Sequence, residues 1–257
     1  MLAARAPTQT GLGLAPMRLD LNLSPGAVHS GVLTVANNGA ALMRIAGSTL
    51  DFFLDQTATP QFAPEYPQEA EFSCRTWLVA NPMEMELNSA AQVPIRYTVR
   101  VPQTATPRSY HCALGFTTQP TAGDTGAIGL RAAVQVVAAI YVVVGKPELE
   151  GTVKDLRLEY ASDPNAPPWR AIVTLNNAGL MHFRPAGDLD VLDERGTVVE
   201  TVHFIPMPVL PKRDQNFVFP LQLAAGEGVY TLRARVDLGG NEIQEATARV
   251  VAAKPRQ

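Results

Sequence analysis

A short sequence that occurs twice limits the folds open to this chain. Leu33–Gly39 (LTVANNG) has a counterpart in Val173–Gly179 (VTLNNAG). In both copies alternating apolar residues run into a turn that contains Asn-Asn and ends at glycine, and a second apolar segment follows. The copies are too far apart for a short solenoid repeat and lie about one domain length apart. The repeat therefore predicts two similar β-sandwich domains in tandem, and it favours a binding protein over an enzyme.

Short segments with period-two alternation continue along the whole chain of 257 residues, punctuated by 21 prolines and 19 glycines. No segment shows a sustained helical period with caps. About seven short strands per domain are typical of an immunoglobulin-like fold. We therefore expect an all-β protein with two tandem immunoglobulin-like β-sandwich domains, residues 14–146 and 147–253, joined at Gly145-Lys146-Pro147.

Each domain is expected to contain about eight strands. The first domain's strands are expected at Met17–Leu23, Gly31–Ala36, Leu42–Phe53, Glu71–Val79, Met83–Leu87, Val93–Val101, Ser109–Thr117 and Gly129–Val144. Those of the second domain are expected at Leu149–Tyr160, Trp169–Leu175, Met181–Phe183, Asp188–Leu192, Val198–Phe204, Asn216–Leu221, Gly228–Val236 and Ile243–Val251. Two long loops, Asp55–Ala70 and Gln119–Gly129, are either functional or ordinary solvated hairpin tips.

Composition excludes some classes of protein. Hydrophobic residues make up 46% of the chain and charged residues 18%, as in ordinary soluble domains. The net charge of −3 does not indicate nucleic-acid binding, for which a basic domain would be expected. No apolar run is long enough to span a membrane. The N-terminus lacks the apolar core of a secretory signal. Either the protein stays inside the cell or the signal has been removed, and we favour the second alternative.

Catalytic and metal-binding patterns are missing from the sequence. The four histidines have no metal-ligand spacing: His29, His111, His182 and His203. Asp188 and Asp190 could begin a calcium loop, but Leu192 occupies a ligand position and the final glutamate is out of register. We therefore expect no enzyme activity, no metal and no cofactor; an enzyme whose residues converge from distant strands remains the alternative, with His111 and His203 as the first residues to test.

The two cysteines, Cys74 and Cys112, lie on separate predicted strands. They form either a disulfide or two buried thiols, since unpaired cysteine is also a commonly buried residue. Tyr110 precedes Cys112 by two residues, which is the spacing of a tyrosine corner. We expect a structural disulfide, and an oxidising compartment follows from it.

The segment Gly129–Val144 is the most suggestive for function. Every second residue from Leu130 is apolar, and β-branched residues are frequent. A strand of this kind is an aggregation hazard at a sheet edge. It is therefore either buried between neighbours or an edge that another chain pairs with. In the second case the partner-binding residues are Leu130, Ala132, Val134, Val136, Ala138 and Ile140.

These features together resemble the PapD-like periplasmic chaperones of pilus assembly. The opening strand Met17–Leu23 with the turn at Asn37-Asn38, the proline-led Pro82–Leu87 and the basic-centred Val93–Tyr97 are similar to that family's strands. So are Ser109–Leu114 and the long strand Gly129–Val144 that exits through Lys146-Pro147. The resemblance implies a non-catalytic protein of the periplasm or cell exterior that binds pilus or surface-assembly subunits by β-strand addition.

The resemblance has one clear departure. Those chaperones hold a subunit's terminal carboxylate with two basic residues, and the positions aligned with them here are Leu21 and Val142, which are apolar. The region from Trp77 to Tyr110 also resembles the WxL-interacting surface proteins of Gram-positive bacteria. A structural or adhesive surface module without chaperone activity is therefore the alternative function, and self-association through an edge strand stays open.

Overall fold

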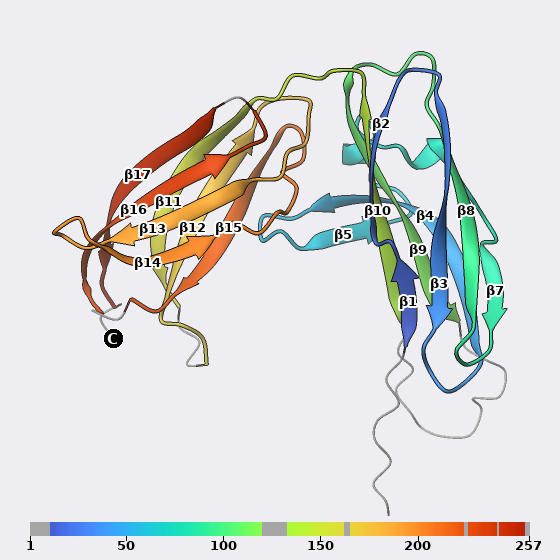
Figure 1. The fold of residues 1–257 in the computed structure, drawn as a ribbon, viewed down its shortest axis with the longest axis horizontal. Helices are drawn as coiled ribbons and strands as arrows, with labels where there is room; N and C mark the ends of the chain where they lie inside the picture. Colours follow the sequence, from blue (N-terminus) through green and yellow to red (C-terminus); the bar gives the residue numbers. More distant parts are fainter. Residues whose placement is uncertain (1–10, 120–132, 162–164, 224–225, 241, 255–257) are drawn as a thin grey trace, which may run out of the picture. The chain divides into compact units, whose positions relative to one another are not determined.

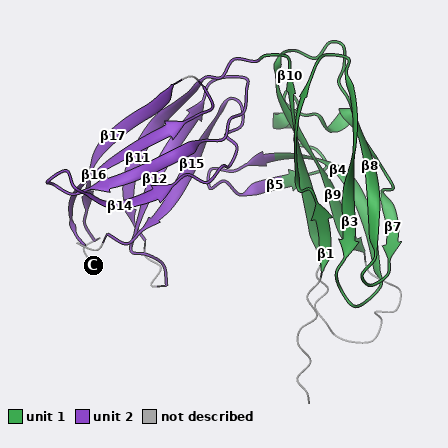
Figure 2. Ribbon diagram, in the orientation of Figure 1, with its two compact units in different colours: residues 1–52, 62–146 green, residues 53–61, 147–257 purple. Residues whose placement is uncertain are grey.

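The computed structural model describes residues 11–119, 133–161, 165–223, 226–240 and 242–254. Its described residues form strands β1 to β17 and two short 3-10 helices, with no α-helix among them (Figure 1). No helix in this part of the chain is long and apolar enough to cross a membrane. The chain divides into two compact units, residues 1–52 with 62–146 and residues 53–61 with 147–257 (Figure 2).

The first unit is a sandwich of two sheets. One sheet has the order β1-β3-β8-β6, and the other has the order β2-β10-β9-β4-β5 with β7 also paired to β4. The bounds are β1 Leu12–Ala15, β2 Arg18–Leu23, β3 Val28–Asn37, β4 Met43–Leu54, β5 Pro60–Ala63, β6 Leu78–Asn81, β7 Glu84–Leu87, β8 Gln92–Arg100, β9 Arg108–Gln119 and β10 Gln135–Val144. The helices η1 Pro67–Glu69 and η2 Arg75–Trp77 follow β5. Fully buried side chains from both sheets, among them Leu33, Ile95 and Ile140, meet in its core.

The second unit is also a two-sheet sandwich, with strand orders β11-β12-β15 and β14-β13-β16-β17. The bounds are β11 Gly151–Tyr160, β12 Trp169–Asn177, β13 Ala186–Leu192, β14 Val198–His203, β15 Arg213–Leu221, β16 Gly228–Asp237 and β17 Ile243–Ala252. Leu175, Leu189 and Leu232 are fully buried between the sheets. The predicted all-β class with two immunoglobulin-like sandwiches is confirmed. The predicted domain limits stay a prediction.

The repeated turn serves the same structural purpose in both units. The Asn37 side-chain amide donates to the carbonyl oxygens of Ala41 and Leu87, and its own oxygen accepts from the Gly39 N–H. Asn177 donates in the same way to Met181 and Val209 and accepts from Gly179. Both asparagines are completely buried. Each therefore ties a strand end to a distant segment, through the Leu87 carbonyl in the first unit and in the second through the Val209 carbonyl, which also accepts from the Phe183 N–H.

A tyrosine corner is also present in both units. The Tyr110 hydroxyl donates to the carbonyl oxygen of Thr106 at 3.2 Å, as the spacing to Cys112 suggested. The Tyr230 hydroxyl donates in the same way to Gly226 at 2.9 Å. The second corner was not predicted, because no cysteine follows Tyr230. Both corners fix the entry into a long strand.

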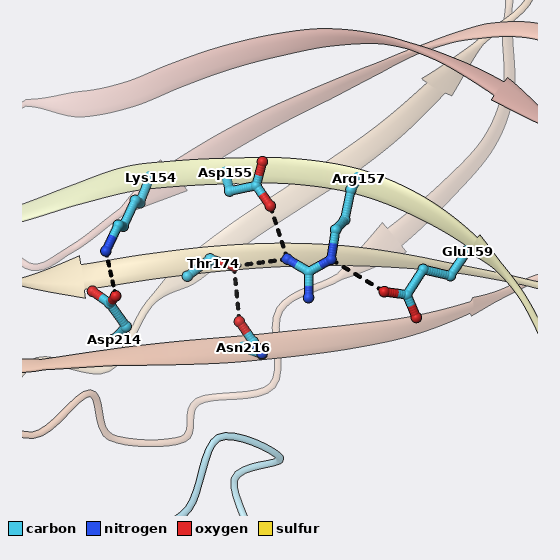
Figure 3. A network of polar contacts seen from close by, with 7 residues as sticks. All are labelled: Lys154, Asp155, Arg157, Glu159, Thr174, Asp214 and Asn216. Carbon is cyan, nitrogen blue, oxygen red and sulfur yellow. Dashed lines mark hydrogen bonds and ion pairs between the residues drawn. The ribbon is translucent and has the colours of Figure 1, made fainter.

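The outer face of the sheet β11-β12-β15 carries a network of charged and polar side chains (Figure 3). Arg157 donates to Asp155 at 2.8 Å and to Glu159 at 3.2 Å, and Thr174 donates to Asn216 at 2.8 Å. Lys154 pairs with Asp214 across the sheet. Both arginine and lysine therefore have carboxylate partners on the same face. Such exposed pairs contribute little stability individually.

Three predicted strands differ from the structure. The segment Glu71–Val79 contains η2 and only the start of β6, because Cys74 pairs with β9 through single main-chain bonds instead of a ladder. Met181–Phe183 contributes one isolated bridge, between Phe183 and Val209. The segment expected at Gly129–Val144 forms a strand from Gln135, and residues 129–132 lie outside the described residues.

Candidate functional site

Strand β10 has one half between two neighbours and one half at an edge. It pairs antiparallel with β9 over its whole length, from Gln135 opposite Thr117 to Val144 opposite Arg108. On its other side β2 runs parallel to it, but this pairing begins only at Ala139. Among the described residues no strand pairs with β10 on that side before Ala139, although β1 lies close to β10. Part of the strand is therefore buried between neighbours and part is an edge, and pairing of that edge by another chain stays a prediction.

The main-chain groups of the edge half can be assigned from the bonds on either side. The Ala139 N–H donates to the carbonyl oxygen of Met17 on the β2 side, whereas the Val134 carbonyl oxygen accepts from Thr118 on the β9 side. Because N–H and C=O directions alternate along a strand, Gln135 and Val137 direct both groups away from β9. These groups form the exposed edge, and a strand added there would find a ready hydrogen-bonding template.

The edge is exposed because the N-terminal segment changes sheets. Strand β1 pairs with β3 in the four-stranded sheet, and after Pro16 and Met17 the chain continues as β2 in the opposite sheet. Pro16 has no N–H to donate to a ladder, so pairing is interrupted at this point. In the part of the chain that the structure describes, the first residues of β10 therefore have no paired strand on one side.

The six residues predicted to bind a partner fall into three groups. Ala138 and Ile140 are fully buried in the unit's own core. Val134 and Val136 are partly buried and pack against that core from its margin. Leu130 and Ala132 lie outside the described residues. Val134 and Val136 are therefore the described residues of this set that can contact a partner without opening the sandwich, and the partner-binding role of the set stays a prediction.

The two positions aligned with the carboxylate-binding basic pair lie directly opposite each other. Leu21 of β2 and Val142 of β10 are register partners in the parallel ladder. Val142 is fully buried and Leu21 is half-buried. The two side chains are therefore neighbours, and because both are apolar they supply no cation for a carboxylate.

Residues 66–77, which include η1 and η2 and which we call the covering segment, join β9 at His111 through main-chain hydrogen bonds of Phe72 and Cys74. The predicted disulfide is confirmed: Cys74 bonds Cys112 of β9 across a sequence separation of 38, with Cα atoms 5.2 Å apart. The His111 Nε2 atom lies 3.3 Å from the Glu69 Oε2 atom, and both side chains are about 2% exposed. His111 is thus an internal residue of this attachment and is closed to any substrate.

The buried Asp51 carboxylate is the second charge under the covering segment. It accepts from the Ser73 hydroxyl at 2.5 Å and from the Tyr66 N–H at 3.1 Å, and Arg75 lies 3.4 Å away. Neither Asp51 nor Glu69 could be singled out from the sequence, because nothing in a strand pattern marks which carboxylate a later loop will cover. Buried charges need such partners, so these contacts position the segment.

The aspartates considered for a calcium loop are bound by protein groups. Asp188 contacts His203 at 2.6 Å, and Asp190 accepts from Arg233 at 2.7 Å and from Thr201 at 2.8 Å. His203 is exposed on its strand and lies far in sequence from His111. No group of three or more His, Cys, Asp or Glu residues that could hold a metal occurs among the residues described.

Asp190 gives the second unit a pH-dependent contribution to stability. Hydrogen bonding from Arg233, followed by that from Thr201, holds the pKa of this carboxyl below its usual value of 3.8. A carboxyl whose pKa is depressed by folding contributes stability above its unfolded pKa and loses it as pH falls through the folded value. We expect the thermal midpoint of this unit to fall below about pH 4, and Asp190→Asn to flatten that dependence.

The matched control for this prediction is Asp214→Asn. The pKa of Asp214 is also lowered, first by Lys154, but its side chain is 39% exposed, whereas that of Asp190 is 6% exposed. Solvent screening should make the control's effect smaller. Thermal unfolding followed between pH 2 and pH 7 checks this, and equal profiles for the two variants would contradict it.

No protein-family model and no curated protein matches this chain. Solved structures of fimbrial chaperones are similar to it over most of its length. A chaperone–tip adhesin complex of CFA/I fimbriae matches with 13% identity and a TM-score of 0.48, covering 95% of this chain and 100% of that one. The E. coli chaperone DraB matches with 15% identity and a TM-score of 0.45, covering 95% and 98%. A Salmonella enterica SafA pilin–SafB chaperone complex matches with 14% identity and 0.46, covering 96% and 98%.

Proposed function

We propose that this protein is a non-catalytic, chaperone-like protein of the periplasm that binds subunits of a pilus or surface assembly by β-strand addition. The observation that carries the proposal is the exposed half of β10, where Gln135 and Val137 direct their main-chain groups away from β9. Main-chain bonds along such an edge supply affinity for a partner strand. The sequence resemblance to PapD-like chaperones supports the same part of the chain as the binding strand.

Apolar side chains next to the edge add to the binding energy. Val134 and Val136 project from the same face of the strand as the buried Ala138 and Ile140, so they extend the core beyond the last covered position. Burying a valine under a partner contributes about 1.5 to 3 kcal/mol at most. Because Leu21 and Val142 supply no cation, binding of this kind depends little on a free carboxyl terminus and little on salt.

The proposal predicts a loss of partner capture in two variants. Val134→Asp/Val136→Asp places charges where a partner's apolar groove would lie, and Val137→Pro removes one edge N–H without touching the ladder to β9. The probe is a fimbrial subunit that lacks its last strand, co-expressed in the periplasm and co-purified. We expect both variants to fold and both to lose capture.

The matched control is Val198→Asp/Val199→Asp, which changes two exposed valines of β14 and should leave capture intact. Folding of the first unit is followed by the fluorescence of Trp77. A folded Val137→Pro variant that still captures the subunit would refute strand addition at this edge. Failure of the unchanged protein to capture the subunit would favour the alternative, a structural surface module.

A further inference from the structure

We propose that the outer face of the sheet β1-β3-β8-β6 docks an acidic surface of a second protein, with Arg96 and Arg100 as its cations. This surface, which we call the basic face, is distinct from the β10 edge and goes beyond the proposed function. Its strands β3 and β8 lie side by side over nine register pairs, from Val28 opposite Arg100 to Ala36 opposite Gln92 (Figure 1).

The basic face carries positive charge that no neighbouring group neutralises. None of its four strands contains an aspartate or a glutamate. Arg96 and Arg100 are exposed, and the described residues include no carboxylate paired with either. Several other sheet arginines do have such partners, as Arg44 has Glu86 and Arg157 has Asp155. In a chain of net charge −3, the described strands of this face therefore carry arginine and no acidic residue.

Apolar side chains alternate with these cations. Val32 lies opposite Arg96 in the β3–β8 ladder, and Val28 lies opposite Arg100. Val28, Val32 and Val79 are 58%, 50% and 59% exposed. Arginine and exposed apolar groups together, with acidic residues depleted, match the composition of protein–protein interfaces. Because these side chains lie on a sheet face and not at a strand edge, they suit a folded partner better than a single added strand.

Charge complementarity selects the occupant. An acidic protein surface neutralises Arg96 and Arg100 and covers the valines between them. A nucleic acid would require more phosphate contacts than two arginines supply. An anionic membrane would require a larger basic cluster and bulkier apolar anchors than valine. A second copy of this chain is also acidic overall, and it is an outcome that the experiment distinguishes.

The test uses the intact protein and a helical peptide with glutamates flanking a leucine stripe, since a helix cannot add to the β10 edge. Binding is measured from backbone amide shifts in NMR spectra. We expect saturable shifts on β3, β6 and β8, and about tenfold weaker binding by Arg96→Gln/Arg100→Gln. The matched control is Arg195→Gln/Arg249→Gln, which removes two exposed arginines of the second unit and should leave binding unchanged.

Each other result overturns the proposal. Equal weakening by the control pair would show general attraction to positive charge, and equal binding of a peptide with glutamine in place of glutamate would remove the electrostatic basis. A dimer in sedimentation that Arg96→Gln/Arg100→Gln dissociates would make a second copy the occupant. Val134→Asp/Val136→Asp should still bind the peptide, so failure of this inference and failure of the proposed function are separable.

Discussion

Asn177→Ala is expected to lower the free energy of unfolding of the second unit by about 1 to 3 kcal/mol, because a fully buried side chain that makes three hydrogen bonds is lost, while the Val209 carbonyl oxygen keeps the Phe183 N–H as a donor. The carbonyls that accept from the Asn177 amide belong to Met181 and Val209, and Asn177 itself is fully buried. Asn37→Ala should act in the same way on the first unit, through Ala41 and Leu87. The measurement is urea unfolding.

Each unit contains one of the chain's two tryptophans, Trp77 in the first and Trp169 in the second. A Trp→Phe change in one unit therefore makes fluorescence specific for the other. The control is Asn176→Ala, which removes a neighbouring side chain that binds the exposed Asp214. Asn177→Asp keeps the acceptor for the Gly179 N–H and loses the donor. If Asn177→Ala cost no more than Asn176→Ala, the buried bonds would not be the reason for the repeat.

The repeat shows how far the sequence alone could reach. Alternation before Asn37 and Asn177, with a glycine two residues after each, was enough to predict two similar sandwiches and a turn in each. It was not enough to predict that these asparagines are buried, because their acceptors Leu87 and Val209 lie 50 and 32 positions away. A local pattern carries no information on which distant segment will end beside it.

Prediction of the binding edge from sequence had the same limit. Alternation from Val134 to Val144 correctly indicated which side chains face the core, since side-chain direction follows the strand's own period. Which strands pair with β10 depends on β2 and on the change of sheet at Pro16. The sequence analysis began the first strand at Met17 and missed β1, whose four residues are too few to establish a period. The extent of the edge therefore had to come from the structure.

Removing the disulfide with Cys74→Ala/Cys112→Ala is expected to destabilise the first unit by about 3 to 4 kcal/mol, the entropy estimate for a closed loop of this length. The loop spans a sequence separation of 38 and includes all of β6, β7 and β8 and the start of β9. The thermal midpoint of the first unit, followed by the fluorescence of Trp77 in a Trp169→Phe background, should fall by roughly 10 °C.

Reduction of the unchanged protein supplies the matched control, because it opens the same loop while both sulfur atoms stay in the core. Cys74 and Cys112 are both fully buried, so the alanine pair adds a cavity that reduction does not. The fall in midpoint on reduction and the fall in the double alanine variant should therefore agree, apart from the cost of that cavity. In a Trp77→Phe background, where Trp169 reports on the second unit, the unfolding midpoint of that unit should not change. If reduction left the Trp77 transition in place while the alanine pair lowered it, the cysteines would stabilise the unit by packing. The covering segment would then be held in place by the buried charges of its own Glu69 and of Asp51 on β4.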